Sequence, residues 1–173
     1  MKMSTDPVRF AHSVFDATLW DRQAEIAHAI ETERRVAVKA CHASGKTFDA
    51  AAIALWFACR HRNARVITLA PGWLTTRAVI WSEIHSLLQR AKFKLPTTVA
   101  NQTEIRCGPD NLLLGLSANE PTRLQGHHAE HILLIADEAT GIDPAFWPAV
   151  EGILASGDSH LLLLGNPTVN SGY

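Results

Sequence analysis

The stretch 35–47 constrains the fold of this 173-residue chain more than any other part of it. Residues 36–38 form a short apolar run with two valines, typical of a buried strand, and small residues follow from Ala40 onward. Gly45-Lys46-Thr47 then precedes an alanine-rich stretch, 48–59, that predicts a helix. This order of elements is typical of a phosphate-binding loop, where backbone N–H groups and a helix N-terminus converge on phosphates.

Each residue type in such a loop has its own use. Gly45 allows the backbone to approach closely, Lys46 reaches the β- and γ-phosphates, and Thr47 offers its hydroxyl to Mg²⁺. The positions that complete the phosphate cradle are Cys41, His42, Ala43 and Ser44. The alternative is a chance Gly-Lys-Thr sequence in an ordinary loop.

One position departs from the usual pattern of this loop. The pattern G-x-x-x-x-G-K-[ST] has glycine where this chain has Ala40. Alanine is small, but it lacks the freedom of glycine at positive φ.

The composition limits the classes to which the chain can belong. A hydrophobic content of 47% is typical of a domain with a buried sheet, and the net charge of −1 provides no basic surface for strong binding of nucleic acid by the chain alone. The sequence has no apolar run of about 18 residues, so we expect no membrane span. Three cysteines without metal-type spacing fit free thiols in a reducing cytoplasm.

The order of apolar segments predicts an α/β domain over 18–173, preceded by a partly ordered arm over 1–17. Strands alternate with helices, which indicates a mainly parallel sheet with helices on both faces. Further strands are expected at 64–71, 132–136 and 160–164, further helices from about 20 to 30 with Asp21 as N-cap, at 75–90 and at 145–155, and an inserted β-hairpin within 97–117.

Polar side chains follow the expected strands at the edge where ligands bind in such sheets. Asp137 and Glu138 come directly after the strand 132–136. Beside a phosphate-binding loop, the first carboxylate is suited to hold Mg²⁺ and the second to deprotonate an attacking water. The alternative is an acidic pair that only caps a helix.

Four further residues are candidates for the same site, each with a structural alternative. Gln23 can donate to and accept from an adenine edge, or it is a surface glutamine beside a core tryptophan. Asn166 or Thr168 can sense the γ-phosphate, or Gly-Asn-Pro is only a turn. Arg123 can enter the site of a neighbouring subunit, or it is an exposed loop residue.

The histidines in and beside the polar loop 118–130 raise the question of a metal site. His127, His128 and His131 lie close in sequence, but no cysteine or carboxylate with zinc-type spacing accompanies them. A solvated loop with one packed histidine is the preferred interpretation.

Taken together, these residues resemble the ATPase domain of terminase large subunits, the DNA-packaging motors of tailed phages. The resemblance covers about residues 18–173, in the order of the family. The matching segments are Trp20-x-x-Gln23, Ala40–Thr47, Val66–Pro71, Arg123-Leu-Gln-Gly126, Ile132–Glu138 and Leu164-Gly-Asn-Pro-Thr168.

The resemblance implies a RecA-like P-loop NTPase fold that binds ATP and Mg²⁺. It assigns Gln23 to adenine, Lys46 and Thr47 to the phosphates and Mg²⁺, and Asp137 to the metal. It makes Glu138 the catalytic base, Asn166–Thr168 the coupling element, and Arg123 a candidate arginine finger acting in trans. Many members of the family carry an arginine at the position of His42, so that function is in question here.

The expected function is ATP hydrolysis that drives packaging of double-stranded DNA into phage capsids. By the same resemblance, the partners are further copies in a ring, a terminase small subunit and a portal, in the host cytoplasm during virion assembly. The family's C-terminal nuclease domain is absent from this sequence, which indicates a motor fragment or a truncated prophage gene. Two alternatives stay open: a helicase-type translocase on nucleic acid, and a nucleotide-binding assembly module with little hydrolysis.

Overall fold

The computed structural model describes residues 4–41, 43–72, 74, 76–118, 121–124, 126–155 and 157–166. Within these ranges, seven strands form one sheet in the order β1-β7-β6-β2-β5-β4-β3. The first five strands of that order are parallel, and β4 and β3 continue the sheet antiparallel. The strands are β1 (Arg35–Lys39), β2 (Ala64–Ala70), β3 (Thr97–Asn101), β4 (Glu104–Cys107), β5 (Asn111–Ser117), β6 (His131–Ala136) and β7 (Asp158–Gly165).

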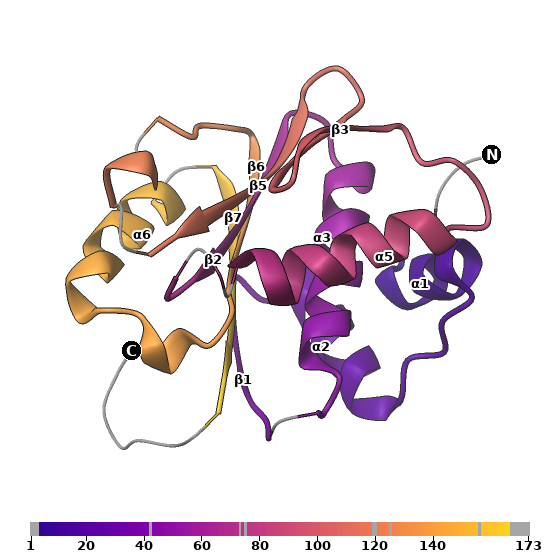
Figure 1. The fold of residues 1–173 in the computed structure, drawn as a ribbon, viewed down its shortest axis with the longest axis horizontal. Coiled ribbons are helices and arrows are strands. Elements are labelled where there is room, and N and C mark those ends of the chain that lie inside the picture. Colours follow the sequence, from indigo (N-terminus) through magenta and orange to yellow (C-terminus); the bar gives the residue numbers. More distant parts are fainter. Residues whose placement is uncertain are drawn as a thin grey trace.

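Helices cover both faces of the sheet, as the sequence predicts. Figure 1 shows α1, α2, α3 and α5 on one face and α6 on the other. The helices are α1 (Pro7–Phe15), α2 (Asp21–Thr32), α3 (Lys46–Arg60), α5 (Ser82–Arg90) and α6 (Trp147–Leu154). Shorter helical segments are η1 (Thr76–Trp81), which leads into α5, η2 (Pro121–Leu124), η3 (Ala139–Gly141) and η4 (Pro144–Phe146), which leads into α6.

The central helix α3 explains the longest apolar stretch of the sequence. Residues 49–58 are all buried, because the sheet covers one side of α3 while α1, α2 and α5 pack around the rest. A helix that is apolar on every side is typical of such a central position. Its many alanines allow the neighbouring helices to approach closely. The first residue of this rigid helix is Lys46.

The strand β1 lies at an edge of the sheet, which corrects the expectation of a buried strand. Among the described strands it pairs with β7. Val36 and Val38 are half-buried, while Arg35, Ala37 and Lys39 are exposed. The two valines therefore lie on the half-buried face of a strand whose side chains alternate between two faces, and the strand as a whole is not buried.

The segment 97–117 contains the predicted antiparallel hairpin, formed by β3 and β4. The last strand of this segment, β5, also lies parallel to β2 in the middle of the sheet, which the sequence did not indicate. Leu113 and Leu116 of β5 are buried as a result. The hairpin therefore extends the edge of the sheet and returns the chain to its interior.

The N-terminal segment is not the partly ordered arm that we expected. Asp6 accepts a hydrogen bond from the backbone N–H of Arg9 and so caps α1, and Pro7 occupies its first turn. Phe10 and Val14 are buried against the core on the side of α3. Because these apolar side chains recur every four residues, α1 has a continuous face to bury. No described helix is long and apolar enough to cross a membrane.

Candidate nucleotide site

Three loops meet at the carboxyl edge of the sheet because β1, β7 and β6 are parallel neighbours. The phosphate-binding loop, residues 40–47, follows β1 and leads into α3. Asn166 follows β7, and the pair Asp137–Glu138 follows β6. Parallel strands bring their carboxyl ends to one edge, so the residues that follow them are placed together.

Lys46 connects these three loops. Its Nζ donates to the backbone carbonyl of Cys41 at 3.3 Å and to Oδ1 of Asn166 at 3.3 Å. The same Nζ lies 3.8 Å from Oε1 of Glu138. The ammonium group is buried with these oxygens around it, which compensates in part for the cost of removing it from water. The structure therefore brings the predicted lysine, carboxylate and amide into one site.

The loop backbone is shaped at Ala43 and Gly45, which have φ values of 59° and 82°. Ala40 is not among the residues with positive φ, so the alanine at this position causes no strain of the kind that glycine would avoid. Its N–H donates to the carbonyl of Gly165 at 3.1 Å, which fixes the start of the loop against β7. His42 lies outside the described residues.

Gln23 is buried and holds the loop, while Trp20 beside it is 53% exposed. This is the reverse of a surface glutamine beside a core tryptophan. The Nε2 of Gln23 donates to the carbonyl of Gly45 at 3.2 Å, and its Oε1 accepts from the backbone N–H of Trp20 at 3.3 Å. Trp20, and not the predicted Asp21, is therefore the N-cap of α2. The contact of Gln23 with adenine stays a prediction.

Asp137 and Glu138 differ in their surroundings. Asp137 is 1% exposed, and burial together with the neighbouring charge of Glu138 raises the pKa of its carboxyl, although the Glu138 N–H and Lys46 act against this. Glu138 is half-buried and has φ of 50°, an uncommon conformation for a residue other than glycine. Backbone strain of this kind often occurs at functional sites. The two carboxylates therefore have distinct environments.

A cavity of about 440 Å³ adjoins the loop, between α2 and β1. Trp20, Gln23, Ile26 and Val38 line it, together with Ser44 and Lys46 at the end next to the loop. Among the described residues, the buried Ser44 hydroxyl has no hydrogen-bond partner. The lining also includes the charged residues Arg22, Glu25 and Lys39, but most of its surface is apolar. A cavity of this kind, with polar groups of the loop at one end, fits a ligand with a flat apolar part and an anionic part.

The donors around the loop also fit a nucleotide with Mg²⁺. The unpartnered Ser44 hydroxyl and the buried Lys46 ammonium suit phosphate oxygens. Thr47, half-buried in the first turn of α3, and Asp137 supply the hard oxygen ligands that Mg²⁺ prefers.

The remaining predicted residues have different positions. Arg123 is exposed in η2, which packs against α6, while Leu124 next to it is buried. Thr168 lies outside the described residues. His131 is the first residue of β6, at the end of that strand away from Asp137, so it does not belong to this site. Neither the bond from Gln23 to Gly45 nor that from Lys46 to Asn166 was predicted, because each joins residues far apart in sequence.

Known proteins give an independent comparison. No protein-family model matches the chain. The probable terminase large subunit of Enterobacteria phage P7 is 27% identical over 187 positions, which cover 97% of this chain and 36% of that protein. The large terminase ATPase domain of Thermus phage P74-26 matches with a TM-score of 0.75 and 21% identity, over 99% of this chain and 72% of that one.

The chain resembles a phage large terminase. The large terminase of the thermophilic bacteriophage D6E in complex with ADP also matches, with a TM-score of 0.65 and 11% identity, over 85% of this chain and 38% of that one. These structures confirm the predicted RecA-like fold. The terminase-like chain spans about a third of the length of its P7 relative.

Proposed function

We propose that this terminase-like chain is a Mg²⁺-dependent ATPase whose hydrolysis cycle drives translocation of double-stranded DNA. One observation carries the proposal. The Nζ of Lys46 lies among groups from all three loops at the sheet edge: the Cys41 carbonyl, the Asn166 amide and the Glu138 carboxylate. A cation in this position, at the start of a helix, is suited to the phosphates of a nucleoside triphosphate.

The chain's own groups would bind and orient the triphosphate. Lys46 exchanges its present oxygen partners for phosphate oxygens, and the backbone around Gly45 supplies N–H donors. Thr47 and Asp137 would hold Mg²⁺, which neutralises charge on the β- and γ-phosphates when it is bound. The likeness to a large terminase solved in complex with ADP supports nucleotide binding by this chain.

Glu138 is the proposed general base. Its carboxylate is partly exposed, so water reaches it, and its Oε1 lies 3.8 Å from the Nζ of Lys46. Asp137, adjacent but more deeply buried, is better placed to hold a cation than to exchange protons with solvent. In this assignment the two neighbouring carboxylates have separate tasks.

The cavity between α2 and β1 is the proposed site of the adenine ring. Trp20 and Ile26 offer apolar surface there. Within the described ranges, Gln23 keeps one N–H and one lone pair available beyond its two hydrogen bonds with Gly45 and Trp20. Binding of the base would therefore be coupled to the position of the phosphate-binding loop.

Assembly would complete the site. Arg123 is exposed on η2, in the segment between β5 and β6 that packs against α6. We infer that it stabilises transition-state charge in a neighbouring copy within a ring, so the isolated chain hydrolyses ATP slowly. The proposed partners are double-stranded DNA, a terminase small subunit and a portal, in the cytoplasm of an infected host, as the resemblance to terminase large subunits implies.

The experiment compares Mg-ATP hydrolysis by the wild type and Glu138→Gln, at concentrations that favour assembly and with double-stranded DNA present. We expect the variant to bind ATP and to hydrolyse it at least about 100-fold more slowly, the usual lower limit for loss of a general base. Glu83→Gln, in α5 and away from the loops, is the matched control. Equal rates for wild type and Glu138→Gln would exclude Glu138 from the mechanism, and ATP binding without hydrolysis by the wild type would favour an assembly module.

A further inference from the structure

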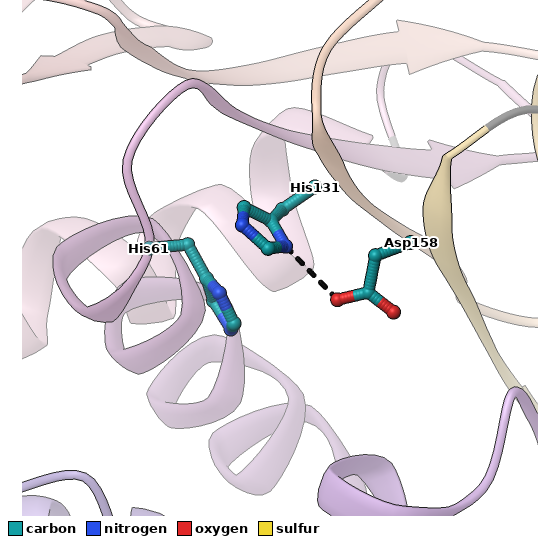
Figure 2. Close-up of side chains that lie close together, drawn as sticks. All are labelled: His61, His131 and Asp158. Atoms are coloured by element: carbon teal, nitrogen blue, oxygen red, sulfur yellow. Dashed lines mark hydrogen bonds and ion pairs between the residues drawn. The ribbon is translucent and has the colours of Figure 1, made fainter.

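A second cluster of ligand-type side chains lies at the opposite end of β6 and β7 from the nucleotide site. His131 begins β6 and Asp158 begins β7, and the two residues are direct partners in the register of the sheet. His61 lies in the turn between α3 and β2. Figure 2 shows these three side chains pointing toward one another from three different elements.

The backbone holds this cluster together. Asn63, in the turn after His61, has φ of 49°, and its carbonyl accepts the N–H groups of both Glu130 and His131, at 3.1 and 3.3 Å. The turn before β2 is therefore bonded to the first residue of β6. This arrangement fixes the distance between the two histidine backbones without any contribution from their side chains.

The side chains are close enough to share one ion. The Nδ1 of His131 lies 2.9 Å from a carboxylate oxygen of Asp158, and the rings of His61 and His131 are 4.3 Å apart between centroids. One donor atom of each residue lies within 4.8 Å of the other two. Donors around tetrahedral Zn²⁺ are about 3.3 Å apart, so closure needs movements of at most about 1.5 Å, within reach of side-chain rotation.

His160 supports the carboxylate from the second side. Its Nε2 lies 3.2 Å from the other oxygen of Asp158, and its Nδ1 lies 3.0 Å from the carbonyl of Glu33. Because both ring nitrogens have partners, His160 positions Asp158 rather than offering itself as a ligand. Groups of this kind orient the ligands of metal sites.

We propose that His61, His131 and Asp158 bind a divalent transition-metal ion, with Zn²⁺ as the ion that matches them best. Two imidazoles and one carboxylate are a ligand set that Zn²⁺ accepts, and water completes its tetrahedral coordination. The Asp158 side chain is 43% exposed, so solvent and the ion have access. The ion would join the turn after α3 to β6 and β7, whose other ends lead to two of the three loops of the nucleotide site.

Another group in the described part of the chain has similar composition but is less suited to bind an ion. Asp6, His28 and Glu31 also lie within 4.8 Å of one another. Asp6 already caps α1 through the N–H of Arg9, and Glu31 pairs with Arg60 at 2.8 Å. An ion there would compete with both partners for the two carboxylates. This second group provides a control of similar composition.

The test is a Zn²⁺ titration of the untagged chain, with a chromophoric chelator as competitor and the thermal midpoint as a second readout. The wild type should bind one equivalent of Zn²⁺ and unfold at a higher temperature with it. His131→Asn should weaken binding at least about tenfold, since loss of a supporting residue alone often costs that much. His28→Asn should bind Zn²⁺ as the wild type does.

Two further measurements keep the proposal falsifiable. Asp158→Asn tests the site at its most exposed ligand, in case a histidine variant fails to fold, and Asp137→Asn shows whether Zn²⁺ binds at the nucleotide site instead. Co²⁺ in the wild type should give the intense visible absorption of a tetrahedral site, lost in Asp158→Asn and kept in Asp137→Asn. Absence of stoichiometric Zn²⁺ binding by the wild type, or unchanged binding by His131→Asn and Asp158→Asn, would overturn the proposal.

Discussion

Asp49 makes the stability of this chain depend on pH in a way that one substitution can reveal. It lies in α3, is 1% exposed, and neither of its carboxylate oxygens has a hydrogen-bond partner among the described residues. Burial raises the pKa of this carboxyl from 3.8 to about 8. We therefore expect the stability of Asp49→Asn relative to the wild type to be higher at neutral pH than at acidic pH.

The magnitude follows from the difference in proton binding between the folded and unfolded chain. Between pH 5 and pH 7 the folded chain keeps the proton of Asp49, whereas the unfolded chain, with its ordinary pKa, has lost it. Stability then falls as pH rises, by about 1.4 kcal/mol per pH unit for this one group. Over two units the wild type loses about 2.7 kcal/mol that Asp49→Asn does not lose.

Urea unfolding of the wild type and Asp49→Asn at pH 5, 6, 7 and 8 measures this difference. All other titrating groups are common to both chains, so their contributions cancel in the comparison. Asp110→Asn, which removes an exposed carboxyl from a turn, is the control and should follow the wild type. Parallel pH profiles for the wild type and Asp49→Asn would refute the assignment of a buried, protonated carboxyl.

Three further substitutions test other parts of the structure. Gly45→Ala should weaken ATP binding at least about tenfold, because φ at Gly45 is 82° and an added Cβ would lie 2.7 Å from Nε2 of Gln23. A fluorescent ATP analogue measures the affinity, and an unchanged affinity would show that this packing is unimportant. Gly152→Ala, in α6 with no atom within 4 Å of the added Cβ, should raise the free energy of unfolding by about 0.5–1 kcal/mol, and a loss of stability in urea would contradict this. Asp6→Ala should cost about 1 kcal/mol through loss of the α1 cap, while Asp6→Asn should retain most of it in the same assay.

The phosphate-binding loop and the acidic pair could be predicted because their signals are local. Gly45-Lys46-Thr47 stands in the loop between a predicted strand and a predicted helix, and Asp137-Glu138 directly follows an apolar strand, so the sequence alone places both at the carboxyl edge of the sheet. The contact between Lys46 and Asn166 depends on strand order, because β7 lies between β1 and β6. Strand order is a tertiary property that no short segment encodes.

Other features were missed for different reasons. The signal for α1 is local: Asp6-Pro7 is typical of a helix start, and the spacing of Phe10 and Val14 gives the helix an apolar face. Burial of Asp49 could not be predicted, since it requires α3 to be covered on every side. The cluster of His61, His131 and Asp158 needs three chain segments to meet, and spacing in the sequence gives no sign of that.

The central claim is that Lys46 holds the phosphates of a bound nucleotide. The most direct measurement is the dissociation constant of Mg-ATP for the wild type and Lys46→Ala, with Lys92→Ala, a surface lysine paired with Asp16, as the control. Loss of a charge-assisted hydrogen bond is worth about 1.5–3 kcal/mol, so Lys46→Ala should bind Mg-ATP at least about tenfold more weakly, and Lys92→Ala should match the wild type. Equal dissociation constants for the wild type and Lys46→Ala would contradict the account.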